Sequence, residues 1–129
     1  MKKMIILAIG VMLSSCSPIA ASFNEQQNLL LSEITVNAHR MIHSCPALKY
    51  ADIDSQLKYK TELFSTYSQN LSNNDEFYKA SQLLDKMVGQ LENQYKDPKS
   101  QPSPAYCVDK LMDISNASAR LLRAEGSLE

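Results

Sequence analysis

Residues 24–45 read NEQQNLLLSEITVNAHRMIHSC, and from about Asn24 this segment carries a helical pattern. Its apolar residues recur at spacings of four, four, three and four: Leu30, Ile34, Ala38, Met41 and Cys45. Such spacings place side chains on one face of a helix. We expect this first helix to begin at about Asn24 and to end at Pro46, because proline cannot continue a helix. Three successive leucines, residues 29–31, cannot all face one core, so one side of the helix is expected to meet another surface.

The next two segments predict a helical hairpin. The second helix carries Ile53, Leu57, Lys60, Phe64, Tyr67 and Leu71, and the third carries Phe77, Ala80, Leu84, Met87, Leu91 and Tyr95, all at spacings of three and four. Asp52 or Asp54 can cap the second helix, because an aspartate side chain accepts a hydrogen bond from a free amide at a helix start. The polar residues 72–75 separate the two helices, so we expect an antiparallel pair with a tight turn.

A proline-bearing loop precedes the last helix. Residues 96–104 contain three prolines, which exclude a continuous helix. Ser103 can cap the following helix, with Pro104 at its first position, where the missing amide hydrogen costs nothing. Gly126 is expected to end this helix. The sequence therefore predicts an all-α fold, a small four-helix bundle.

The N-terminus indicates export and lipidation. Lys2 and Lys3 precede an apolar run, residues 4–13, that is too short to anchor stably across a bilayer. Residues 13–16 read LSSC, a lipobox-like pattern in which Cys16 can become a thioether to diacylglycerol, with acyl chains such as palmitate. We expect a signal peptide over residues 1–15, a lipidated tether over 16–23 and a helical domain over 24–126. The alternative is ordinary cleavage after Ala21.

The two remaining cysteines are expected to form a disulfide. Oxidation is favoured in an exported compartment, and Cys45 and Cys107 are the thiols left once Cys16 carries lipid. The bridge would tie the end of the first helix to the start of the last, compatible with a parallel neighbour pair or a splayed arrangement that leaves a groove. The alternative is two free buried thiols.

Charge and composition argue against several classes of function. The formal net charge is −1, and without Lys2 and Lys3 the remainder carries 11 basic and 14 acidic residues, which leaves no basic footprint for nucleic acid. His39 and His43 have the spacing of two metal ligands on a helix but lack a third partner, so we expect no metal site. Glycine-rich phosphate loops and nucleophile motifs are missing. We therefore expect no enzyme, no cofactor and no small-molecule substrate, but a protein-binding surface.

The order of these features resembles the type II secretion pilotins, small lipoproteins that escort a secretin. The resemblance rests on the lipobox ending in Cys16, a first helix ending in residues 42–45 (IHSC), the hairpin, and residues 102–104 (PSP) leading into Cys107. It implies a four-helix fold with a groove that captures the C-terminal segment of a secretin, which folds into a helix on binding. It also implies outer-membrane localisation on the periplasmic side through the lipid anchor, and Ser17 after the cysteine is consistent with release from the inner membrane.

We nominate six residues as candidates for the groove: Leu31, Ile42, Phe64, Tyr67, Met87 and Met112. Methionine suits such a surface because its side chain adapts to an amphipathic partner helix. Two other classes of protein remain open. One is an immunity or exclusion lipoprotein that blocks a toxin or an incoming phage or plasmid component, and the other is a structural lipoprotein of an envelope machine.

Overall fold

The computed structural model describes residues 23–128, and they form four helices, as the sequence predicts. In chain order the elements are α1 (Glu25–Met41), the 3-10 turn η1 (Ile42–Ala47), α2 (Tyr50–Ile53), the π turn η2 (Asp54–Lys58), α3 (Tyr59–Gln69), α4 (Asp75–Gln94) and α5 (Pro104–Gly126). The segments α2, η2 and α3 follow one another without a break and act as one helix of the bundle. The expectations for the signal peptide, for Cys16 and for the tether up to residue 22 lie outside the described residues.

The helix ends follow from local hydrogen bonds. At the start of α1, Asn24 Oδ1 accepts the Gln27 amide at 3.0 Å, and at the start of α5, Ser103 Oγ accepts the Tyr106 amide at 3.1 Å. These bonds satisfy amides that have no partner within the first helical turn. The expected starts of the first and last helices are thereby confirmed.

Two boundaries differ from the prediction. The α-helical part of the first helix ends at Met41, and the chain continues as η1 through Pro46, which has no amide hydrogen to bond the Ile42 carbonyl as an α-helix would require. The second helix begins at Tyr50, two residues before Asp52. Asp52 still caps it, since its Oδ2 accepts the Lys49 amide at 3.2 Å.

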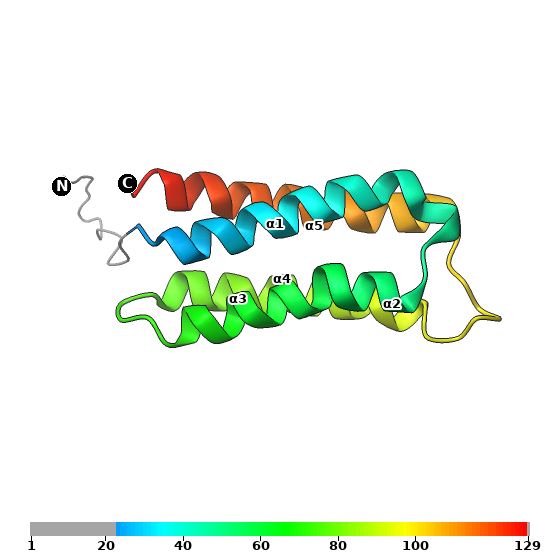
Figure 1. Cartoon of the computed structure of the whole chain (residues 1–129), viewed down its shortest axis with the longest axis horizontal. Helices are drawn as coiled ribbons and strands as arrows, with labels where there is room; N and C mark the ends of the chain where they lie inside the picture. The colour runs from blue at the N-terminus through cyan, green and yellow to red at the C-terminus, as the bar shows by residue number, and fades with distance from the viewer. Residues whose placement is uncertain (1–22, 129) are drawn as a thin grey trace.

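The helices form a closed, antiparallel bundle. Figure 1 shows α1 and α5 along one side and α3 and α4 along the other, with both ends of the described chain at the same end of the bundle. The Cys45–Cys107 disulfide joins η1 to α5 at one end, and Asn24 contacts Glu125 at the other. α1 and α5 are therefore antiparallel neighbours, which corrects the expectation of a parallel or splayed pair: the end of one helix beside the start of the next requires opposite directions.

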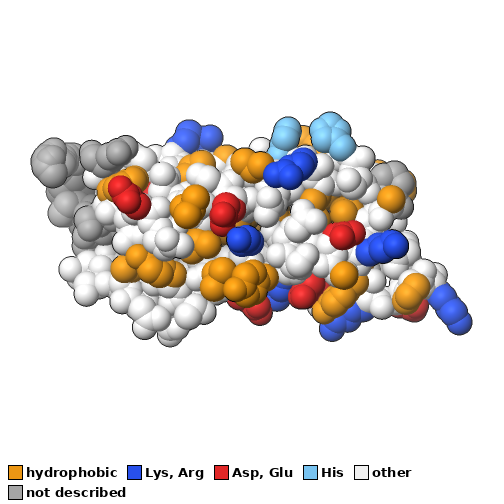
Figure 2. All heavy atoms as spheres, in the orientation of Figure 1, with side chains coloured by type: hydrophobic (Ala, Val, Ile, Leu, Met, Phe, Trp, Pro, Cys, Tyr) orange, Lys and Arg blue, Asp and Glu red, His pale blue; other side chains and the backbone are white. Residues whose placement is uncertain are grey.

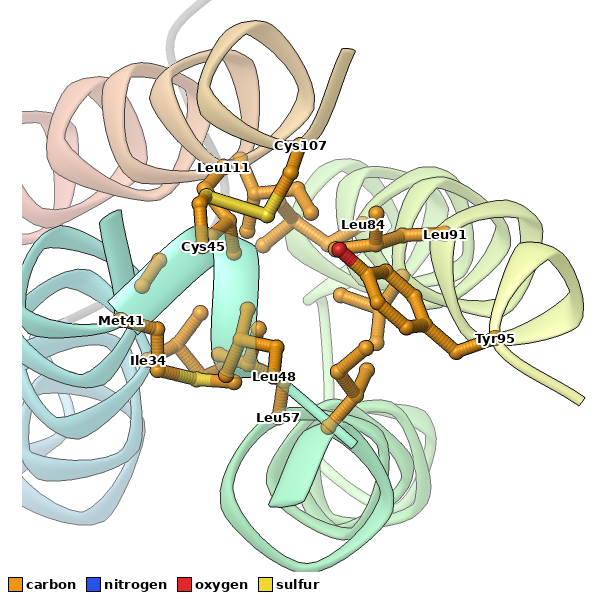
Figure 3. Packing of buried hydrophobic residues seen from close by; sticks show 14 of the residues in the cluster. Ile34, Met41, Cys45, Leu48, Leu57, Leu84, Leu91, Tyr95, Cys107 and Leu111 are labelled. Atoms are coloured by element: carbon orange, nitrogen blue, oxygen red, sulfur yellow. A yellow bond between two sulfur atoms is a disulfide. The ribbon is translucent and has the colours of Figure 1, made fainter. Parts of the chain in front are cut away.

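Apolar side chains from all four helices fill one core. Figure 3 shows Ile34, Leu57, Leu84 and Leu111 directed toward a common centre, with the disulfide among them. The bridge links Cα atoms 5.7 Å apart and confirms the predicted pairing. Among residues 29–31, Leu30 and Leu31 are buried and Leu29 is 52% exposed, in agreement with the expectation that the three cannot share one core.

The end of the bundle that holds Asn24 and Glu125 is joined by a buried polar network. Gln27 Oε1 accepts from Ser68 Oγ at 2.8 Å and from Asn74 Nδ2 at 2.6 Å, while Gln27 Nε2 donates to Glu125 Oε2 at 3.2 Å. Glu125 also accepts the Asn24 amide at 2.5 Å. Burial raises the Glu125 pKa, although both of these hydrogen bonds favour its charged form. Side chains from α1, α3, the α3–α4 turn and α5 thus hold one another in place.

None of the described helices combines the length and the apolar character that a bilayer span needs.

Candidate partner-binding groove

The six nominated groove residues do not share one surface. Leu31 and Phe64 have no exposed area and belong to the core, so a partner cannot reach them in the closed bundle. Ile42, Tyr67 and Met87 are half-buried, on η1, α3 and α4 respectively. Met112 is 47% exposed on α5. The spacing of apolar residues predicts which side chains face inward. It does not distinguish a groove from the core, and the fully buried Leu31 and Phe64 belong to the core.

The structure places Met87 in an apolar groove of about 180 Å³ between α4 and α5. The groove is lined by Ala80, Leu83, Leu84, Met87, Ala117, Arg120 and Leu121. Ala80 and Ala117 have small side chains, which leave space between the two helix surfaces. Met112 lies five residues before Ala117, so helical periodicity turns it to another face of α5.

Leu83 stands at the edge of the groove with 59% of its area exposed, the largest exposed fraction among the exposed large apolar residues of the described chain. The neighbouring Leu84 is buried and forms part of the groove floor. A partner that covered Leu83 would remove apolar surface from water at a gain of roughly 25 cal/mol per Å². The thioether of Met87 beside it can adapt to different apolar shapes.

Arg120 is the one charged residue that lines the groove. It is exposed, and within residues 23–128 it makes neither an ion pair nor a hydrogen bond through its side chain. Its guanidinium therefore remains free to bind a group from outside the described part of the chain. Together, the lining offers an apolar floor with one cation at the edge.

A second cleft, of about 470 Å³, lies between α3 and α4 and is polar. Lys58 Nζ donates to Asp85 Oδ2 at 2.8 Å, and Thr61 Oγ1 donates to Asp85 Oδ1 at 2.7 Å. Burial works against the charge of Lys58, but the hydrogen bond and the charge of Asp85 outweigh it and raise the Lys58 pKa. Polar and charged side chains line this cleft, so it is less suited than the α4–α5 groove to burying an apolar helix.

A buried carboxyl lies near the end of α4. Glu92 is 6% exposed, and its Oε2 has no hydrogen-bond partner among the described residues. Burial, followed by the adjacent carboxyl of Asp54 in η2, raises the Glu92 pKa to about 7, while Lys58 and Lys96 lower it. This pair was not predictable from residue spacing, because the two carboxyls are 38 positions apart in the chain.

His39 and His43 lie together at the surface, with ring centroids 6.2 Å apart in an edge-to-face arrangement. Figure 2 shows both histidines at the edge of the molecule, next to basic side chains. Within the part of the chain that the structure describes, no cluster of three or more potential metal ligands forms.

Most of the groove residues were not predicted from the sequence, although a signal for them was present. Leu83 and Leu84 are adjacent, so one of these two leucines is expected to face outward, as among residues 29–31. Ala117 and Leu121 fall four residues apart on the last helix, which marks a shared face. Which helix lies opposite cannot be read from such spacings. Comparison of the chain with protein-family models, with curated proteins and with solved structures finds no match.

Proposed function

We propose that this protein is a pilotin-like lipoprotein that binds the C-terminal segment of a secretin and carries it to the outer membrane for type II secretion. The groove between α4 and α5 is the observation that carries the proposal. It offers an exposed leucine and an adaptable methionine beside an apolar lining of alanine and leucine side chains, which is the kind of surface that receives one face of an amphipathic helix.

The lipid anchor supplies the second part of the proposed activity. Acyl chains on Cys16 would contribute about 0.8 kcal/mol of membrane affinity per buried methylene group. Only a few residues separate Cys16 from Asn24, where the bundle begins, so a segment bound in the groove would travel with the anchor. The protein would then lie on the periplasmic face of the outer membrane.

The bundle is suited to work as a preformed receptor. The Cys45–Cys107 disulfide holds one end and the Gln27 network holds the other, so α4 and α5 need not rearrange to present the groove. The ordering cost of binding would fall on the secretin segment, which is the usual behaviour of a disordered tail that folds on its receptor.

Titration of a peptide tests the proposal. A labelled peptide of about 20 residues from the C-terminus of a secretin of the same organism, long enough to span about 30 Å as a helix, is added to the detergent-extracted protein. We expect saturable binding. Leu83→Asn should weaken it by about tenfold, the cost of losing one buried leucine contact.

Leu29→Asn is the matched control, because Leu29 is a leucine of similar exposure on α1, away from the groove. It should leave the affinity unchanged. No binding at high micromolar peptide would overturn the proposal, and equal losses in the two variants would place the binding surface elsewhere.

A further inference from the structure

Arg120 occupies a position in the groove that is not explained by the stability of the fold. Its side chain is exposed at the edge of an apolar lining, next to Ala117 and Leu121. Exposed arginines commonly pair with a carboxylate one turn away on the same helix. The residues at those positions on α5, namely 116, 117, 123 and 124, include no acid.

Two acidic residues lie at the two ends of the region around Arg120. Asp113 lies four residues before Ala117 on α5, and Glu76 lies four residues before Ala80 on α4, so periodicity places each near one end of the groove. Asp113 and Arg120 are seven positions apart, a distance of about 10 Å along a helix. A negative group on a partner is thus favoured beside Arg120 and disfavoured at the two ends.

We infer that the groove selects an amphipathic helix that carries a side-chain carboxylate beside its apolar face, and that Arg120 receives this carboxylate. The inference rests on the proposed function and adds a chemical requirement to the partner. A guanidinium presents paired donors that match the two oxygens of a carboxylate, so the contact fixes the position of the helix as well as adding affinity. Apolar contacts with Leu83 and Met87 would hold the helix, and the ion pair would set its register.

The test uses two designed helical peptides with blocked ends. Both have the same leucine and alanine face, and one carries a single glutamate next to that face where the other carries glutamine. We expect the glutamate peptide to bind the detergent-extracted protein about twofold to fivefold more tightly at low salt, the range of a partly exposed ion pair. The difference should shrink at high salt, because screening weakens exposed charge pairs.

Two arginine variants locate the effect. Arg120→Gln should abolish the preference for glutamate, so that the two peptides bind this variant with equal affinity. Arg123→Gln is the matched control, since Arg123 is exposed on the same helix but does not line the groove. It should keep the preference. Thermal melts of both variants should match the parent, because neither side chain is buried.

The outcomes separate this inference from the proposed function. Equal affinities for the two peptides, or a preference that survives Arg120→Gln, would overturn the role of Arg120 while leaving secretin binding intact. Binding of the glutamate peptide by an Arg120-dependent contact, with no binding of the secretin segment, would overturn the proposed function alone. Failure of both designed peptides to bind would overturn the inference.

Discussion

Glu92 is one of two buried carboxyls, with Glu125, whose raised pKa makes the stability of the bundle depend on pH. Its pKa is about 7 in the folded chain, against an ordinary value of 4.5. Between these two pH values the folded protein keeps a proton that the unfolded chain has lost, so the free energy of unfolding falls as the pH rises. The stabilisation is complete below pH 4.5 and lost above about pH 7, and its full size corresponds to about 3 kcal/mol.

Glu92→Gln should remove this dependence, because the amide is neutral at every pH. We expect the variant to unfold with nearly the parent free energy at pH 4.5 and to be more stable by about 3 kcal/mol at pH 8. Urea unfolding of both proteins at the two pH values measures this. If the variant and the parent differed in free energy of unfolding by the same amount at pH 4.5 and at pH 8, the raised pKa of Glu92 would be contradicted.

Gln27 differs from Glu92, because its side-chain amide is buried and both of its polar atoms have hydrogen-bond partners. Gln27→Ala would leave Ser68, Asn74 and Glu125 without their contacts, and we expect a loss of about 2–4 kcal/mol in the free energy of unfolding. Gln26→Ala is the control at an exposed neighbouring position and should change stability by less than about 0.5 kcal/mol. Similar denaturation curves for the two variants would show that the network adds little.

At the level of the helices, the disulfide and the Gln27 network hold opposite ends of the α1–α5 pair. The bridge closes a loop of 62 positions, which in the chain-entropy model stabilises the fold by about 4 kcal/mol. Reduction should therefore lower the melting temperature by at least several degrees and speed hydrogen exchange in η1 and at the start of α5 first. A calorimetric scan with and without reductant measures the shift, and an unchanged melting temperature would contradict the structural role of the bridge.

The helices were predictable because their signals are local. Helical spacing, the cap at Ser103, the break at residues 72–75 and the pairing of Cys45 with Cys107 all follow from nearby residues or from compartment chemistry. The π turn η2, the exposed edge at Leu83 and the contact of Gln27 with Glu125 depend on which helix lies opposite. Spacing shows that a side chain faces inward, but it does not identify the neighbour, and for that reason the nominated Leu31 and Phe64 are core residues.

At the scale of the whole molecule, the proposed function needs an anchor as well as a groove. Intact mass measurement of the protein extracted from membranes should show an acylated chain that begins at Cys16. A product that begins at Ser22 without lipid would contradict the anchor, and it would make the protein a soluble periplasmic binder instead.

The central claim is that the partner binds in the groove between α4 and α5, and hydrogen exchange can test this location. Exchange is measured by mass spectrometry on the detergent-extracted protein with and without the bound secretin segment. We expect slowing to concentrate in residues 80–87 of α4 and 117–121 of α5, the two segments that line the groove. Slower exchange confined to α1 and α3, with exchange in α4 and α5 unchanged, would contradict binding in this groove.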